Sequence, residues 1–195
     1  MSCVYCLKLN GSALRINRCC ATIQKTPAKH TSTTKGASKK MLKINIPGRE
    51  ELVLNHLILD YNGTIAEDGE IIESIRPRLA ELAKDLSIYV ITADTHGTAA
   101  KKCEGLPLQV LTFPTTEVGA IKAQEAKKCT GGVVTIGNGF NDIQMSDAAD
   151  LSICVIGREG CCGALLAHTD IVVTSIDDAL DLLLKTGRTR ATLRT

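Results

Sequence analysis

Residues 52–64 read Leu-Val-Leu-Asn-His-Leu-Ile-Leu-Asp-Tyr-Asn-Gly-Thr, a largely apolar run that stops at Asp60 and turns at Gly63. A short apolar run bounded by a turn predicts a buried strand over residues 52–59. Because the turn follows at once, the Asp60 carboxylate is expected at the carboxyl edge of a sheet. In open α/β sheets that edge binds the ligands. This segment therefore predicts both the kind of fold and the place of the site.

Strands and helices alternate along the rest of the chain. Strands are predicted at residues 87–92, 108–111, 133–136, 151–156 and 171–173, and helices at 75–85, 95–103, 116–128, 142–149, 160–167 and 176–185. This alternation predicts an α/β fold, a doubly wound parallel sheet in three α/β/α layers. Only ten residues separate Thr64 from Ile75, and about thirty separate Thr92 from Lys122. Neither gap is long enough to hold a cap domain, that is, an inserted domain that covers the site.

The first forty residues differ from the rest of the chain. They carry eight Lys or Arg and no acid, and they show no hydrophobic period. We expect residues 1–40 to be a disordered basic extension and residues 41–195 to be the catalytic domain. An extension upstream of a domain that opens at Met41 is favoured, because Leu42–Ile46 alternates like an edge strand. An organellar transit peptide and a basic tail for an anionic partner remain alternatives.

Composition narrows the class of protein. With 44% hydrophobic residues and no apolar run near 18 residues, the sequence predicts a soluble domain without a membrane span. Residues 41–195 hold 15 basic and 21 acidic residues, and aromatics are only 3% of the chain, which argues against nucleic acid as a partner. The nine cysteines fit unpaired thiols in a reducing cytoplasm. A zinc site at Cys3, Cys6, Cys19 and Cys20 is the weaker alternative.

Polar residues follow three of the predicted strands. Asp60 ends the first, Thr92 ends the second, and Gly-Asn-Gly-Phe-Asn-Asp, residues 137–142, follows the fourth. Lys122 lies on the helix predicted at residues 116–128, which precedes the fourth strand. This set suits phosphoryl transfer, with Asp60 as nucleophile and Thr92 and Thr64 as donors to phosphoryl oxygens. Oxygen ligands such as Asp60 and Asp142 make Mg²⁺ the expected cation.

These motifs resemble those of the haloacid dehalogenase (HAD) superfamily. Asp60-Tyr61-Asn62-Gly63-Thr64 is similar to the family motif Asp-x-x-Gly-Thr. Residues 91–95, Ile-Thr-Ala-Asp-Thr, and residues 137–142 resemble the Thr-Gly-Asp and Gly-Asp-Gly-x-Asn-Asp motifs of P-type ATPases. The likeness covers residues 50–185 and is greatest to the stand-alone phosphorylation domains called soluble P-type ATPases.

The resemblance implies a role for each matching residue. Asp60 would be transiently phosphorylated, while Thr92 and Lys122 would steady the phosphoryl group. The implied Mg²⁺ ligands are Asp60, the backbone carbonyl of Asn62, Asn138 and Asp142. Gly63, Thr64, Ala93 and Asn141 are the candidate substrate-binding residues.

Two departures from the family pattern predict slow turnover. Asn62 stands where phosphatases of the superfamily carry a second aspartate, which acts as general acid and base. That assistance is typically worth about 10²–10⁴ in rate. Asn138 replaces an aspartate ligand, which predicts weak Mg²⁺ binding.

Three functions stay open at this point. The first is a slow Mg²⁺-dependent hydrolase of a phosphorylated small molecule or protein, with a second copy of the chain covering the open site. The second is a phosphate-binding or regulatory module that has lost catalysis with its general acid. The third is a phosphoryl acceptor within a larger assembly. Asp94 is expected to cap a helix, and Arg158 is a weaker candidate for contact with a substrate anion.

Overall fold

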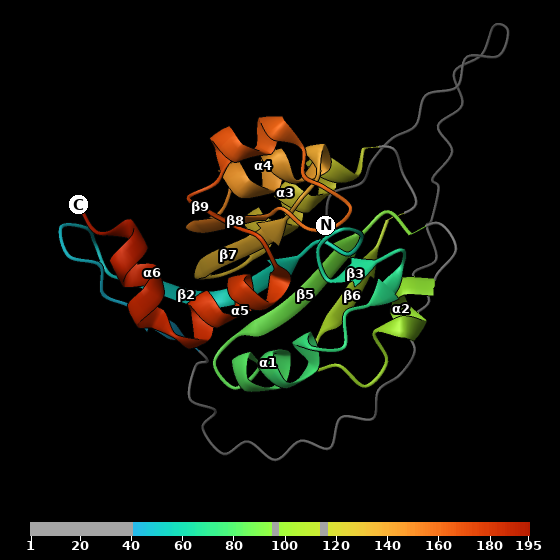
Figure 1. Ribbon diagram of the computed structural model, residues 1–195, viewed down its shortest axis with the longest axis horizontal. Coiled ribbons are helices and arrows are strands. Elements are labelled where there is room, and N and C mark those ends of the chain that lie inside the picture. Colours follow the sequence, from blue (N-terminus) through green and yellow to red (C-terminus); the bar gives the residue numbers. More distant parts are fainter. Residues whose placement is uncertain (1–40, 95–97, 114–116) are drawn as a thin grey trace, which may run out of the picture. The chain divides into compact units, whose positions relative to one another are not determined.

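A computed structural model describes residues 41–94, 98–113 and 117–195 of the protein (Figure 1). The predicted extension at residues 1–40 lies outside the described residues. The strands are β1 (Leu42–Ile44), β2 (Leu52–Leu59), β3 (Ala66–Glu67), β4 (Glu70–Ile71), β5 (Ser87–Thr92), β6 (Gln109–Thr112), β7 (Gly132–Gly137), β8 (Leu151–Val155) and β9 (Ile171–Val173). The α-helices are α1 (Ile75–Leu82), α2 (Thr98–Lys102), α3 (Val118–Lys128), α4 (Ile143–Asp147), α5 (Ile176–Leu184) and α6 (Thr186–Leu193). Two 3₁₀ helices are η1 (Phe140–Asp142) and η2 (Gly163–His168).

The main sheet has the strand order β6-β5-β2-β7-β8-β9, and every pair along it is parallel. The chain moves outward from β2 through β5 to β6, and then returns to the other side of β2 with β7. This reversal between β2 and β7 is the switch point at which doubly wound sheets bind ligands. The predicted fold class is confirmed.

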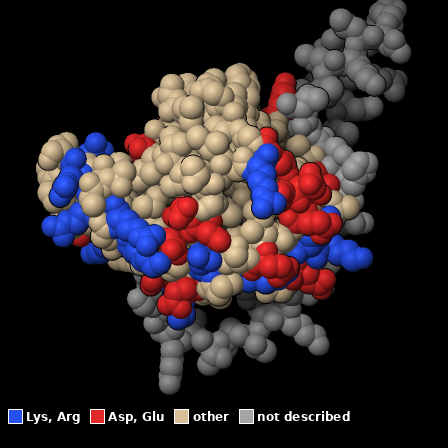
Figure 2. Space-filling view, in the orientation of Figure 1, with Lys and Arg blue, Asp and Glu red and all other residues tan. Residues whose placement is uncertain are grey.

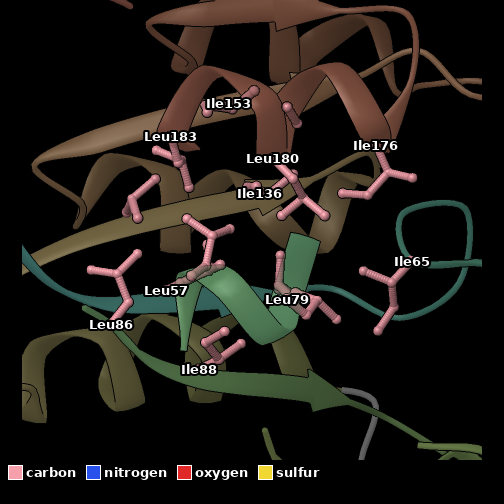
Figure 3. Close-up of a cluster of buried hydrophobic side chains, with 14 of the residues drawn as sticks. Leu57, Ile65, Leu79, Leu86, Ile88, Ile136, Ile153, Ile176, Leu180 and Leu183 are labelled. Atoms are coloured by element: carbon pink, nitrogen blue, oxygen red, sulfur yellow. The ribbon is translucent and has the colours of Figure 1, made fainter. Parts of the chain in front are cut away.

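The two faces of the sheet are built from alternating residues of the same strands. In β2, Leu57 and Leu59 belong to the larger buried cluster, while Ile58 belongs to the smaller one on the opposite face. The larger cluster contains residues of α1 and α5, including Leu79 and Leu180 (Figure 3). The smaller includes residues of α3 and α4. A strand buried on both faces reads as one apolar run, which is why residues 52–59 stand out in the sequence.

Some predicted elements have other bounds or another form. Residues 160–167 were expected to be an α-helix, but the structure has the 3₁₀ helix η2 at Gly163–His168. The helix expected at 142–149 is divided into η1 and α4. The edge strand expected at Leu42–Ile46 is observed as the shorter β1, which pairs antiparallel with the beginning of β2 and with no other described strand. The hairpin β3–β4 and the helix α6 were not predicted.

The described surface mixes charges of both signs. Arg78 lies 3.0 Å from Asp181 and 3.3 Å from Asp177, and Lys185 lies 2.7 Å from Asp181. On the face shown in Figure 2, basic and acidic side chains lie next to one another. Among the described helices, none is long and apolar enough to cross a membrane.

Candidate active site

The carboxyl ends of β2, β5 and β7 bring the predicted residues together. Asp60 directly follows β2, and its backbone N–H donates to the carbonyl of Ile136 in β7 at 3.0 Å. Thr92 is the last residue of the neighbouring strand β5. Sheet hydrogen bonding therefore fixes the position of Asp60 at the switch point.

The turn after Asp60 is held by its own backbone. The N–H groups of Ile65 and Ala66 donate to the carbonyl of Tyr61 at 3.0 and 2.9 Å. Gly63 has a φ of +73°, and a Cβ there would lie 2.2 Å from Nδ2 of Asn138. Both the conformation and this close approach require glycine. The turn leaves Asn62 exposed at the mouth of the site.

Lys122 is a fully buried cation between two carboxylates. Its Nζ donates to Oδ1 of Asp60 and, at 2.6 Å, to Oδ1 of Asp142. The Lys122 side chain has 0% of its surface exposed, as has that of Asp142, while Asp60 keeps 10%. The expected position of Lys122 beside Asp60 is thus observed.

The cluster shifts the pKa values of its members. The pKa of Asp60 is raised to about 6, first because the carboxyl group is buried and second because Asp142 repels its charge, while Lys122 offsets part of this shift. Burial alone lowers the pKa of Lys122, but its two carboxylate neighbours reverse the shift and raise it. Lys122 therefore stays charged and keeps Asp60 from being more strongly protonated.

Asp142 holds both Lys122 and the loop that follows β7. Its Oδ1 accepts from Lys122, and its Oδ2 accepts from the backbone N–H groups of Asn138 and Gly139 at 3.0 and 2.9 Å. Both oxygens thus have protein partners, and Asp142 does not line the pocket described below. The prediction that it ligates a cation stays a prediction, and its observed contacts position Lys122 and the loop that carries Asn138.

Asn138 links three segments of the site. Its Oδ1 accepts from the Thr64 hydroxyl at 3.1 Å, and its Nδ2 donates to the carbonyl of Gly160 at 3.2 Å. Its backbone carbonyl accepts from the N–H of Cys162 at 2.8 Å. The contacts of Gly160 and Cys162 with Asn138 were not predicted from the sequence, in which Gly157 and Gly160 indicate only a loop at this edge of the sheet.

A pocket of about 420 Å³ opens above Asp60. It is lined by Asp60, Asn62, Thr92, Ala93, Asp94, Asn138, Gly139 and Asn141. All the predicted catalytic and substrate-binding positions except Gly63, Thr64 and Lys122 thus face this pocket. Each of the three contacts a residue that lines it: Lys122 contacts Asp60, and Gly63 and Thr64 lie against Asn138.

Two further predicted residues have clear partners. Asp94 accepts from the N–H of Ala99 at 2.6 Å and from the Thr98 hydroxyl, so it caps the first turn of α2 as expected. Arg158 is 84% exposed, pairs with Glu67 at 3.2 Å and does not line the pocket.

The donors around the pocket suit a hard cation held weakly. The described residues contain no group of three or more His, Cys, Asp or Glu side chains placed to hold a metal ion. Of the two carboxylates that line the pocket, Asp94 caps helix α2, and Asp60 is left to bind a cation, together with the amide of Asn138 and the backbone near Asn62. Mg²⁺ accepts such a set because it keeps several waters and needs only one or two carboxylates. The residues therefore fit Mg²⁺ better than zinc.

Comparison with known structures identifies the fold. A deoxy-D-mannose-octulosonate 8-phosphate phosphatase from Haemophilus influenzae, solved with cobalt, superposes with a TM-score of 0.59 at 13% identity, over 73% of this chain and 94% of that one. A similar phosphatase structure from Vibrio cholerae gives 0.58 at 14% identity, over 78% and 98%. A third, from Moraxella catarrhalis with magnesium, phosphate and KDO, gives 0.55 at 14% identity, over 72% and 94%. The chain therefore has the fold of the HAD-family hydrolases.

Sequence comparison identifies nearer relatives. No family model matches the chain. A 62-residue segment, 32% of the chain, is 52% identical to the uncharacterized protein MJ0073 of Methanocaldococcus jannaschii and covers 67% of that protein. Another 39 residues, 20% of the chain, are 49% identical to the uncharacterized protein MJ0072 of the same organism and cover 89% of it. The chain belongs to the same family as these two archaeal proteins.

Proposed function

We propose that this protein is a slow, Mg²⁺-dependent HAD-type hydrolase that acts on phosphate esters or anhydrides through an aspartyl-phosphate on Asp60. One observation carries the proposal: a strand-end carboxylate faces an open polar pocket while a fully buried lysine holds one of its oxygens. A purely structural ion pair has no need of the pocket. The fold shared with phosphatases supports the same conclusion.

The proposed reaction has two displacements at phosphorus. Lys122 holds Oδ1 of Asp60, so Oδ2 attacks the phosphorus of the bound substrate. The bond to the leaving oxygen breaks, and that oxygen takes a proton from water. A water molecule then attacks the phosphorus of the aspartyl-phosphate, releasing inorganic phosphate and the Asp60 carboxylate. The hydroxyl of Thr92 donates to a phosphoryl oxygen during both steps.

Mg²⁺, held by Asp60, the Asn62 carbonyl and Asn138, would offset the negative charge of the phosphoryl oxygens. Asn138 is kept in place by Thr64 and Gly160. With an amide in place of a carboxylate at this position, the site has one negative charge fewer, and we expect weak affinity.

Asn62 accounts for the slow rate in this proposal. It lines the same pocket as Asp60, and it stands at the sequence position where phosphatases of the superfamily carry their general acid. A side-chain amide neither gives up nor accepts a proton at neutral pH. Hydrolysis of the intermediate is then unassisted, which favours a long-lived phosphoenzyme of the P-type kind.

The open pocket bears on the choice of substrate. Within the described chain, the segment between β2 and α1 contains only the small hairpin β3–β4, which is too short to enclose a ligand. We propose that the substrate is a phosphorylated small molecule or protein, and that a second copy of this chain could close the pocket. A cytoplasmic protein that binds neither nucleic acid nor membrane remains our expectation.

The alternative is a phosphate-binding or regulatory module that has lost catalysis. The amide at position 62 favours it, because the pocket and its buried lysine would persist without a general acid. The two functions differ in their products, since only the hydrolase releases inorganic phosphate continuously.

The test uses p-nitrophenyl phosphate and acetyl phosphate with Mg²⁺, and Asp60→Asn as the control. Slow release of phosphate that stops in Asp60→Asn supports the hydrolase. Phosphate bound to the folded protein without turnover supports the module. A stable phosphoenzyme without turnover supports an acceptor within a larger assembly. Equal release by wild type and Asp60→Asn would refute the role of Asp60.

A further inference from the structure

Two thiols lie almost at bonding distance beside the site. Cys154, in β8, is fully buried, and Cys161, in the following loop, is half-buried. Their sulfur atoms are 2.9 Å apart. Since the bond in a disulfide is about 2.05 Å, closure needs a movement of only about 0.9 Å.

The loop that carries Cys161 also holds Asn138. We call residues 156–162 the β8 loop. It turns tightly, with a hydrogen bond of 3.0 Å from the N–H of Gly160 to the carbonyl of Gly157. The residues on either side of Cys161 both bind Asn138, Gly160 through its carbonyl and Cys162 through its N–H. A displacement of Cys161 is therefore passed directly to Asn138.

We propose that Cys154 and Cys161 form a reversible disulfide, and that this bond weakens the cation site through Asn138. A low-molecular-weight disulfide such as oxidised glutathione is the oxidant. The Cys161 thiolate attacks it and releases one glutathione thiolate, leaving a mixed disulfide. Cys154 loses its proton and attacks the Cys161 sulfur, which releases the second glutathione. Two protein thiols are oxidised, and one glutathione disulfide is reduced to two thiols.

The environment of the two thiols sets this order. Cys161 reaches the surface, whereas Cys154 lies in a strand paired with β7 at Gly137 and with β9 at Val172. Burial raises the pKa of Cys154 to about 12, and the hydrogen bond with Cys161 adds to this. Cys161 is thus the first thiol to react. Because β8 is held on both sides, the movement on closure falls on the β8 loop.

Peptide mapping tests the bond itself. Trypsin cuts after Arg158, which separates residues 129–158 from residues 159–185. After treatment of the full chain with oxidised glutathione, we expect these two peptides to be joined, and to remain joined in Cys129→Ser and Cys162→Ser. Cys161→Ser should abolish the link. A link through Cys129 or Cys162, or a Cys154 that stays free after Cys161 has been oxidised, would overturn the proposal.

A titration with Mg²⁺, followed by the melting temperature, tests whether the disulfide weakens the cation site. This part of the proposal rests on the proposed function. Changes around a metal's ligands commonly cost about 10–100-fold in affinity, so oxidation should raise the Mg²⁺ needed for half of the shift about tenfold. Dithiothreitol should reverse this, and oxidant should not change Cys161→Ser. A disulfide that leaves the titration unchanged would overturn the coupling. No response to Mg²⁺ in the reduced protein would instead refute the cation site, and the mapped bond would stand.

Discussion

Replacing Lys122 by methionine gives the sharpest test of the charge cluster. The change keeps the length and apolar stem of the side chain but removes the cation that contacts both Asp60 and Asp142. Two buried carboxylates would then face each other without a cation between them. Breaking a buried ion pair in this way costs about 3–5 kcal/mol. For a domain of this size, the melting temperature should fall by roughly 10 °C.

The loss should depend on pH in a definite direction. The pKa of Asp60 is raised from 3.8 to about 6 in the folded protein. A carboxyl group with a raised pKa lowers stability as the pH rises from its unfolded to its folded value, because the folded state resists ionisation. Removal of Lys122 takes away a lowering influence and moves the folded pKa further up. The difference between Lys122→Met and wild type should therefore be small near pH 5 and widest above pH 7.

Urea unfolding followed by circular dichroism in EDTA is the suitable assay, since the chain has no tryptophan. Lys128→Met is the matched control: it lies on the same helix, is 66% exposed and pairs with Glu125, so its loss should stay below about 1 kcal/mol. Adding Asp142→Asn to Lys122→Met should recover part of the stability. The reasoning fails if the Lys122 and Lys128 variants lose equal stability, or if the Lys122 loss is the same at pH 5 and pH 8.

Three further substitutions, with one control outside the site, test individual parts of the site. Asn62→Asp should raise p-nitrophenyl phosphate hydrolysis at least about tenfold by restoring a general acid, and an unchanged rate would refute the role given to Asn62. Gly137→Ala should cost about 1–3 kcal/mol in urea unfolding, because a Cβ there lies 2.5 Å from Cγ of Asp142. Gly187→Ala, in helix α6, is the control: a Cβ there has no neighbouring atom within 4 Å, so the change should stabilise the protein by about 0.5–1 kcal/mol. A similar loss of stability in both variants would contradict the proposed clash between a Cβ at position 137 and Asp142. Asn138→Asp should tighten Mg²⁺ binding, seen as a larger Mg²⁺-dependent rise in melting temperature; a smaller rise would exclude Asn138 as a ligand.

Three strands of the main sheet could be predicted because their sequences allow little else. Residues 52–59, 87–92 and 171–173 are strands with the predicted bounds. Helix α6 was missed because it has no apolar face; only Thr189 and Leu193 in it are buried. The strands β3 and β4 are two residues each, too short to show a period. Residues 160–167 contain two glycines, Gly160 and Gly163, and glycine disfavours an α-helix.

For the site, the sequence predicts which residues come together, but not which contacts each of them makes. Strand ends at Asp60 and Thr92, and a lysine on the helix before β7, follow from the topology of a parallel sheet. The different roles of Asp142, which positions Lys122, and of Asn138, which faces the pocket, do not follow from it. They depend on which oxygens the backbone N–H groups of a single loop reach, and sequence spacing carries no information on that.

The buried cluster also has a consequence for how the chain folds. Asp60 and Lys122 are 62 positions apart, so their contact cannot form within a local segment. A partly folded chain that paired β2 with β5 before α3 docked would bury a carboxylate without its cation. That penalty disfavours such an intermediate, and the closure of a long loop must be completed before the contact compensates for it. The residues proposed for phosphoryl transfer thereby couple the two halves of the sheet into one cooperative folding unit.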